Sequence, residues 1–210
     1  MRNAVYYSAN KNYVWTDKQR IFEELPASIK CEIALEMYFG VIKKIRFFDD
    51  KDNNLIGSIV PLLTPFKAAK FEYIYKKNSH PAAIYFITKG RVSFYLARKG
   101  IAFKDMVEGG YFGDLDIVFG RKRRYSMLST VDSDFLIMTK QILEDIIVKE
   151  YPEVYEEMSL VAIEREKRIK AAKQIALVEY NEMIENEGEE TNSPYRTYKK
   201  ELRAYSQKRK

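Results

Sequence analysis

The residues with the clearest chemical potential lie between Tyr111 and Met127, in the stretch YFGDLDIVFGRKRRYSM. Two aspartates, Asp114 and Asp116, precede four consecutive basic side chains, and a glycine lies on either side of the acidic pair. Glycines let a backbone approach a ligand closely, and the N–H groups of a helical turn point at an anion. An arginine adds forked donors that match phosphate oxygens. The stretch therefore contains the parts of an anion site, although most such charge runs are solvated surface.

The overall composition indicates one globular unit with appendages. The chain has 210 residues, and 46% of them are hydrophobic, which is enough to bury a sizeable core. Its net charge of +6 comes from 36 basic and 30 acidic residues, so the positive excess is mild on a highly charged surface. The composition is compatible with an anionic partner but does not require one, and we expect no nucleic acid partner.

The rare side chains exclude most enzymatic sites. A single cysteine, Cys31, and a single histidine, His80, leave no disulfide framework and no Cys/His metal cluster. Because there is also no Ser-His-Asp set and no phosphate loop of the Gly-Lys-Ser/Thr type, we expect neither an enzyme nor a cofactor. No apolar run approaches the roughly 20 residues that cross a bilayer. We therefore expect this chain by itself to be soluble, which also fits the soluble part of a membrane protein.

The first quarter of the chain has a helical pattern. Within residues 1–48, apolar side chains recur at three- and four-residue steps from Ile29 to Ile45, with a predicted interruption near Gly40. Short helices joined by tight turns are expected there. The segment LIGSIVPLL follows as a short apolar helix, kept short by one proline within it and another shortly after it.

The pattern changes from Ala68 to Phe135 into short runs of β-branched and aromatic residues separated by turns. The runs are FEYIY, AIYFIT, RVSFYLA, IAFKDMV, RYSMLSTV and DFLIM. Short strands at such close intervals are typical of a barrel or jelly roll.

A helical period returns after the strands. It covers Gln141 to Glu150 and, after Pro152, a second helix that can run to about Glu187. The mixed charges of this second helix favour an exposed helix that rests on one narrow apolar side. From Gly188 the tail has little periodicity and ends basic, so we predict that it is largely disordered.

This order of elements resembles the cyclic nucleotide-binding domain. The residues that carry the resemblance span about Leu25 to Ile169. They are Ala83 to Ile87 with Lys89 to Val92, the glycine-framed run Gly109 to Asp114, Arg123 with Ser126, and Tyr151 with Pro152. The resemblance implies an α+β fold in which an eight-stranded β-roll, or jelly roll, contains a phosphate-binding cassette and is followed by a long C-terminal helix.

The flanks of the roll narrow this resemblance to channels. LPASIKCEIALEMYFGVIKKIRFF is similar to the second half of the helical linker of cyclic nucleotide-gated, hyperpolarisation-activated and related potassium channels, and VAIEREKRI is similar to the lid helix of the hyperpolarisation-activated group. The implied division is a partial C-linker over residues 1–48, the binding roll with flanking helices over 49–152, the lid helix and its extension over 153–187, and a basic disordered tail over 188–210.

The resemblance also implies which residues hold the phosphate and ribose. Gly113, Asp114, Leu115 and Asp116 form the turn at the cyclic phosphate, and Arg123 supplies the cation. The family has glutamate where this chain has Asp114, and that side chain accepts a hydrogen bond from the ribose 2′-hydroxyl. Aspartate is one methylene shorter, so the bond lengthens or is made through water.

Two further departures concern charge near the phosphate. Asp116 replaces a small neutral residue, and a second carboxylate there costs on the order of 1–4 kcal/mol of binding energy at surface-like dielectric. Arg121, Lys122 and Arg124 add positive charge that can offset it. Arg124 also replaces a threonine or alanine, so the hydroxyl that favours guanine is missing. We therefore expect cAMP to bind at least as well as cGMP.

The base is expected to lie under the last helix. Arg165 and Ile169 match positions that cover the base in the family, and Met106, on the strand before the glycines, is a candidate for an apolar wall. A plainer interpretation stays open, in which Arg165 is solvated and both Ile169 and Met106 pack in the core.

The resemblance predicts a regulatory module on the cytoplasmic side of a membrane, within a tetrameric cation channel, in the first place a potassium channel. Binding of cAMP or cGMP would shift the helices of residues 1–48, which would contact neighbouring subunits in a homo-tetramer and bias the pore domain. One alternative is a homology domain that binds no ligand and acts through contacts between subunits. Another assigns RKRR and the basic tail to nucleic acid, although the tail would equally suit anionic lipid.

Overall fold

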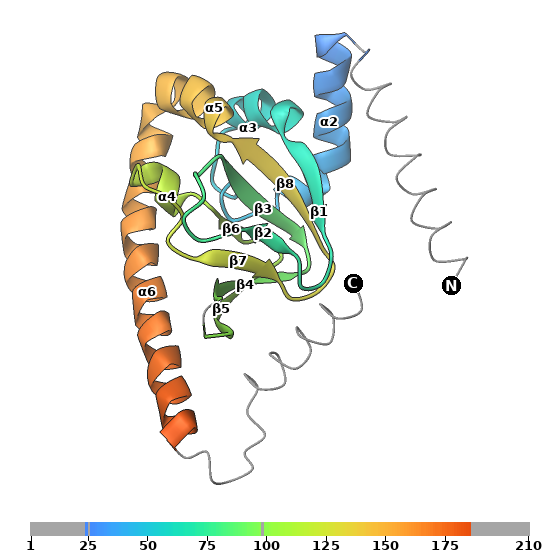
Figure 1. Ribbon diagram of the computed structural model, residues 1–210. Helices are drawn as coiled ribbons and strands as arrows, with labels where there is room; N and C mark the ends of the chain where they lie inside the picture. The colour runs from blue at the N-terminus through green and yellow to red at the C-terminus, as the bar shows by residue number, and fades with distance from the viewer. Residues whose placement is uncertain (1–23, 25, 98, 186–210) are drawn as a thin grey trace, which may run out of the picture.

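The computed structural model describes residues 24, 26–97 and 99–185, and these form two four-stranded antiparallel sheets wrapped by helices (Figure 1). The first sheet has the order β1-β8-β3-β6. Its strands are β1 (Thr64–Ala68), β8 (Ser133–Thr139), β3 (Ala83–Lys89) and β6 (Tyr111–Phe112). The second sheet has the order β2-β7-β4-β5. Its strands are β2 (Tyr73–Tyr75), β7 (Ser126–Ser129), β4 (Arg91–Leu96) and β5 (Ile101–Val107). The predicted α+β fold with an eight-stranded roll is confirmed.

Two of the eight strands are absent from the runs that the sequence pattern predicts. β1 contains Pro65, the proline that follows the short apolar helix, and the predicted strands begin only after it. Proline is tolerated there because β1 is an edge strand that pairs only with β8, so its missing N–H breaks no central ladder. β6 is only two residues long and lies inside the glycine-framed run, where no alternation can be detected.

The helices before the roll are more continuous than predicted. Helix α2 runs through Ala27–Ile42, so the predicted interruption near Gly40 is wrong. An added Cβ at Gly40 would meet nothing within 4 Å, and glycine within a helix costs only about 1 kcal/mol relative to alanine. The short apolar helix is confirmed as α3 (Asn53–Ile59), continued by a 3₁₀ turn over Val60–Leu62.

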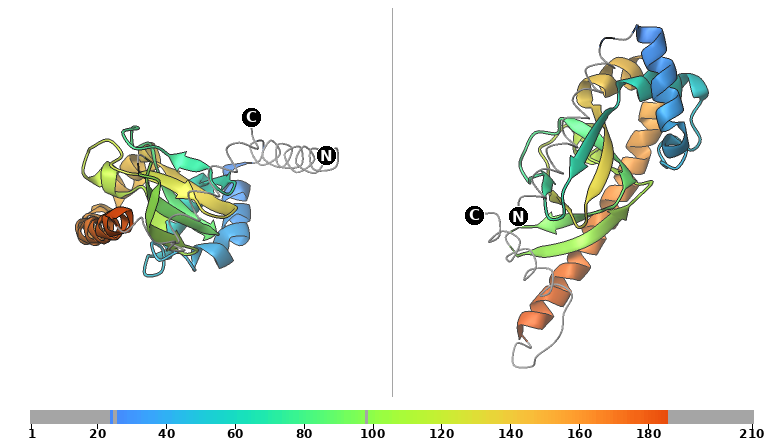
Figure 2. Two further views of the ribbon diagram at one scale, coloured as in Figure 1. Left: turned by 60° about the horizontal axis from the view of Figure 1, so that its bottom comes forward. Right: turned by 90° about the vertical axis from the view of Figure 1, so that its right-hand side faces the viewer.

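Two helical segments follow the roll, in the predicted order. The first consists of α5 (Lys140–Ile142) and a π-helical stretch over Leu143–Val148. The second is α6 (Pro152–Glu185), which lies along one side of the roll and extends past it (Figures 1 and 2). The predicted end near Glu187, the tail over 188–210 and most of the segment before α2 lie outside the described residues. No described helix is both long and apolar enough to span a membrane.

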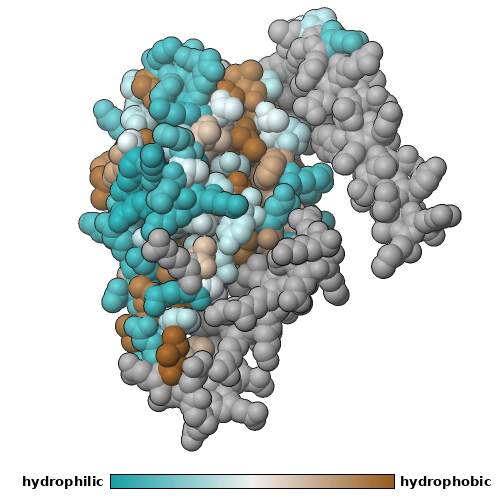
Figure 3. All heavy atoms as spheres, in the orientation of Figure 1, coloured by the Kyte–Doolittle hydropathy of each residue, from teal (hydrophilic) through white to brown (hydrophobic). Residues whose placement is uncertain are grey.

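Two clusters of buried side chains hold these layers together. One joins the segment after α2 to the first sheet and to the start of α6, with Phe48, Phe86 and Met158 among its members. The other fills the roll and includes Phe112 and Ile169, the latter being only 2% exposed. Ile169 thus anchors α6 on the roll. On the face seen in Figure 3, the coloured residues are mainly hydrophilic, with hydrophobic ones interspersed.

Candidate functional site

A sharp turn between β6 and helix α4 (Leu115–Val118) creates the centre of the candidate site. Gly113 has a φ of +91°, and a Cβ added there would lie 2.8 Å from the carbonyl oxygen of Ala83. Only glycine combines this left-handed backbone with so close an approach. The turn starts α4 and brings Asp114 and Asp116 into the interior.

Arg123 lies behind this turn and is 1% exposed. Its Nη1 donates to the Gly113 carbonyl oxygen at 2.5 Å, and its Nη2 donates to the Ala83 carbonyl oxygen at 2.7 Å. The guanidinium carbon also lies 4.3 Å from the centre of the Tyr75 ring. Arg123 therefore clamps the α4 turn to the start of β3, in addition to any contact it makes with a ligand.

Asp114 is completely buried and is paired with helix α6. Its Oδ2 accepts a hydrogen bond from Arg165 Nη1 at 2.7 Å, while Arg165 Nη2 donates to the carbonyl oxygen of Tyr111 at 2.7 Å. Burial raises the pKa of the Asp114 carboxyl, and the Arg165 charge and the backbone N–H groups of Asp114 and Leu115 oppose that rise. This ion pair joins the turn to α6.

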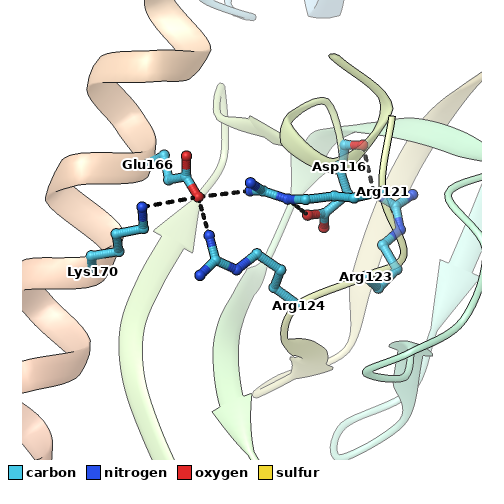
Figure 4. A network of polar contacts seen from close by, with 7 residues as sticks. Asp116, Arg121, Arg123, Arg124, Glu166 and Lys170 are labelled. Carbon is cyan, nitrogen blue, oxygen red and sulfur yellow. Dashed lines mark hydrogen bonds and ion pairs between the residues drawn. The ribbon is translucent and has the colours of Figure 1, made fainter. Parts of the chain in front are cut away.

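A second set of ion pairs joins the same turn to α6 through Glu166 (Figure 4). Arg121 donates from Nε to Asp116 Oδ1 at 3.0 Å and from Nη2 to Glu166 Oε1 at 2.8 Å. Arg124 Nη1 also donates to Glu166 Oε1, and Lys170 Nζ lies 3.4 Å from the same oxygen. Arg121 thus provides the pairing of Asp116 that the sequence suggested.

Glu166 is the functional candidate that the sequence analysis missed. Its only visible signal was a spacing of four residues to Lys170, which is common on solvated helices. Its side chain is nevertheless only 14% exposed. Burial pushes the pKa of Glu166 upward, but the hydrogen bond from Arg121 and the charges of Arg121, Lys170 and Arg124 outweigh burial and leave that pKa lowered. Glu166 is therefore ionised at neutral pH.

Two cavities of very different size lie beside these residues. The one at α4 has a volume of about 10 Å³ and is lined by Gly113, Asp114, Asp116, Arg121 and Glu166, among others. The other has a volume of about 530 Å³ and lies between residues 46–51, β5 and α6. Both are lined in part by Phe94 and Ile169, so the two are neighbours.

The predicted ligand residues fall around these two cavities. Met106, Arg165 and Ile169 line the larger one. Gly113, Asp114, Leu115 and Asp116 line the smaller one, with Ile169 shared by both. Arg124 points to Glu166, and Arg123 lies behind the turn. The structure thus brings these residues into one region between the roll and α6, and their contact with a ligand stays a prediction.

Two buried polar atoms in this region have no hydrogen-bond partner among the described residues. They are Asp114 Oδ1 and Arg123 Nε. A buried polar atom without a partner costs about 1–3 kcal/mol, more if it is charged, and such atoms occur at functional sites. Asp114 Oδ1 can accept a hydrogen bond and Arg123 Nε can donate one, but of the two residues only Asp114 lines a cavity, the smaller one.

The three arginines of the basic run RKRR form hydrogen bonds or ion pairs within the chain. Arg121 and Arg124 pair with carboxylates and Arg123 with carbonyls, whereas Lys122 is exposed. This arrangement favours a role inside the roll over a surface for nucleic acid, which needs free cations along one face.

Comparison with known proteins agrees with the fold. Residues 65–150 match the family model described as the cyclic nucleotide-binding domain. Over 154 residues the chain is 30% identical to the cyclic nucleotide-gated channel cone photoreceptor subunit alpha of Gallus gallus, which covers 68% of this chain and 21% of that protein. It is also 30% identical over 155 residues to the cyclic nucleotide-gated channel alpha-3 of Homo sapiens, covering 70% of this chain and 22% of that protein. The chain therefore spans about a fifth of the length of these relatives.

Proposed function

We propose that this chain binds a cyclic nucleotide and passes the binding signal to the pore of a tetrameric cation channel. The premise is that residues 65–150 are a cyclic nucleotide-binding domain homologous to those of cyclic nucleotide-gated channels. The observation that carries the proposal is that the α4 turn is held between Arg123 on the roll side and Arg165 on α6. A ligand at this turn contacts both the roll and the lid.

The proposed ligand lies across the two cavities. Its cyclic phosphate lies at α4 beside Arg123, its ribose hydroxyl donates to Asp114 Oδ1, and its base enters the larger cavity against Met106 and Ile169. The larger cavity falls within the range of about 300–1,000 Å³ that is usual for small-molecule sites. Since Arg124 offers no hydroxyl to a guanine, we expect cAMP to bind at least as well as cGMP.

Ligand entry requires side chains around the small cavity to move, either on the turn or on α6. The cavity at α4, about 10 Å³, is at the lower limit for a single water molecule, so a phosphate enters only if side chains of the turn or of α6 move. Helix α6 in turn shares a core cluster with Phe47 and Phe48, which follow α2. Movement of the lid is thereby transmitted to the proposed linker, by an amount limited to the ligand's preference for the moved state.

The linker and tail assignments extend the proposal to partners. We place the contacts with the pore domain and the fourfold contacts between subunits at residues 1–48, on the cytoplasmic side of the membrane, in a channel that conducts potassium. Deletion of residues 1–40 keeps the buried side chains of Ile42, Ile45 and Phe47, so the roll should still fold and should sediment as a monomer. A truncated chain that still sediments as a tetramer would refute this assignment. Contact of the tail, residues 188–210, with anionic lipid stays a prediction.

Calorimetric titration of the purified chain with cAMP, cGMP and 5′-AMP tests the proposal. We expect micromolar binding of cAMP, no tighter binding of cGMP and at least about ten-fold weaker binding of the non-cyclic nucleotide. Arg123→Lys keeps the charge but loses the forked donors, so cAMP affinity should fall by about ten-fold or more. Lys122→Arg, which likewise exchanges one cation for another but at the exposed neighbouring position, is the matched control and should bind like the wild type.

A second candidate function is supported by the contacts that the arginines already form within the chain. Both Nη atoms of Arg123 donate to carbonyls, and Glu166 pairs with Arg121 and Arg124. In this alternative the roll binds no nucleotide and regulates the channel through contacts between subunits. Absence of heat up to millimolar cAMP and cGMP, from a chain shown by circular dichroism to be folded, would favour it.

A further inference from the structure

The Glu166 carboxylate is surrounded by more positive charge than one ion pair needs. A single oxygen, Oε1, contacts Arg121 Nη2, Arg124 Nη1 and Lys170 Nζ. Two of these cations come from the segment that follows α4, and the third from the next turn of α6. A carboxylate held by guanidinium groups resembles a bound phosphate monoanion in both charge and hydrogen-bond geometry.

The same carboxylate shares its space with the proposed phosphate position. Glu166 lines the small cavity together with Gly113, Asp116 and Arg121, which belong to the turn or to its basic run. Since that cavity measures about 10 Å³, a phosphate and the Glu166 carboxylate do not fit there together. They would also compete for Arg121 and Arg124.

We infer that Glu166 is an internal competitor for the phosphate of the ligand, so that nucleotide entry must displace the Glu166 carboxylate from Arg121 and Arg124 and thereby release one of the ionic contacts that hold α6 on the rest of the domain. This inference rests on the proposed function, because it assumes an anionic nucleotide at the α4 turn.

Arg165, which is adjacent to Glu166, keeps α6 in contact with the roll when the Glu166 carboxylate is displaced. Arg165 and Glu166 are adjacent on α6 and pair with opposite charges of the roll, Asp114 and the Arg121–Arg124 run respectively. An incoming anion competes for Arg121 with Asp116 of the roll as well as with Glu166, but on α6 it displaces only Glu166, whereas the Arg165 pair and the buried Ile169 keep the helix attached. The lid therefore changes its orientation around a retained contact and does not dissociate. This gives ligand binding a mechanical consequence without full detachment of α6.

The competition lowers nucleotide affinity in the wild type by a measurable factor. Removal of one negative charge a few ångströms from a phosphate, in a partly buried site, increases affinity by about ten-fold. We therefore expect Glu166→Gln to bind cAMP about ten-fold more tightly than the wild type. Glu166→Asp keeps the charge but shortens the reach to the two arginines, so its affinity should lie between the two.

A matched control separates this effect from a general change of charge on α6. Glu164 lies two residues earlier, is 65% exposed and pairs with Arg168 across one helical turn at 2.6 Å. Glu164→Gln removes the same charge from the same helix but away from the small cavity, so its cAMP affinity should stay within about two-fold of the wild type. A second control is adenosine, which carries no phosphate. Its affinity should not rise in Glu166→Gln.

Titration calorimetry of the full chain, with thermal unfolding of each variant to verify folding, decides among the outcomes. Tighter cAMP binding in Glu166→Gln, with Glu164→Gln and adenosine unchanged, supports the internal competitor, and so does cAMP binding that appears only in Glu166→Gln. Binding by the wild type that is unchanged or weaker in both Glu166 variants overturns the competitor and leaves the proposed function intact. If no folded variant binds cAMP or cGMP, both the competitor and the proposed function are wrong.

Discussion

Arg165 on α6 and Asp114 at the start of α4 form a buried ion pair in which Nη1 lies 2.7 Å from Oδ2, although 51 residues separate them in the chain. The Asp114 side chain is completely buried and that of Arg165 is 18% exposed. Breaking a buried ion pair by removal of one partner is strongly destabilising, because it leaves a charge without compensation. This contact between α6 and the roll therefore contributes to the stability of the fold.

Replacement of Arg165 should therefore destabilise the whole domain. Arg165→Met leaves the Asp114 carboxylate buried and unpaired, and we expect the free energy of unfolding to fall by about 3 kcal/mol in urea denaturation. Arg168→Met is the matched control, since Arg168 is 68% exposed and pairs only across one turn of α6, so its loss should be about 0.5 kcal/mol or less. Equal losses in the two variants would show that the buried pair has no special role.

The deficit of Arg165→Met should depend on pH. Burial raises the pKa of Asp114 above its ordinary value of 3.8, and loss of Arg165 removes the strongest effect that opposes this rise. A carboxyl whose pKa is raised on folding favours the folded state most when it is protonated, and this contribution is lost as the pH rises through the folded-state pKa. The variant should therefore approach wild-type stability as the pH is lowered from 7 towards 4. A deficit that is constant over this range would contradict the assignment.

Arg123 should be required for folding as well as for ligand binding. Arg123→Met removes both donors from the buried carbonyl oxygens of Gly113 and Ala83, and we expect a loss of about 3 kcal/mol in the free energy of unfolding. Lys122→Met changes the exposed neighbour and should cost less than about 0.5 kcal/mol. If guanidinium denaturation finds the two variants equally stable, the carbonyl clamp is not a stabilising feature.

Gly113 should tolerate alanine less well than Gly120, although both have positive φ values. An added Cβ at Gly113 would lie 2.8 Å from the Ala83 carbonyl oxygen, whereas at Gly120 it would meet nothing within 4 Å. Gly120→Ala therefore carries only the cost of a left-handed residue, about 1–2 kcal/mol. Gly113→Ala adds a backbone clash, and we expect at least about 1 kcal/mol more. Thermal unfolding of the two variants measures the difference, and similar melting temperatures would argue against the close approach.

Much of the fold can be predicted from local patterns in the sequence. The short runs of β-branched and aromatic residues, separated by turns, predict β2, β3, β4, β5, β7 and β8, because such side chains favour a pleated and buried surface. The glycine before DLDIV predicts the turn and α4, since few other residues adopt that backbone. The strands β1 and β6 could not be found this way. β1 contains a proline, which is tolerated only because this strand lies at a sheet edge. β6 has two residues, which is too short to show a period.

The sequence by itself determined the types of residue in the candidate site, whereas the tertiary structure decided their partners. Asp114, Arg123 and Arg165 are visible as candidates because their chemistry and spacing match a known pattern. Their partners depend on how the chain packs in space. Arg123 donates to two carbonyl oxygens within the roll. The packing of α6 against the roll pairs Arg165 with Asp114, and Glu166 with Arg121 and Arg124. The physical reason is that charge pairing acts over a few ångströms in space, and separation along the chain does not specify such distances.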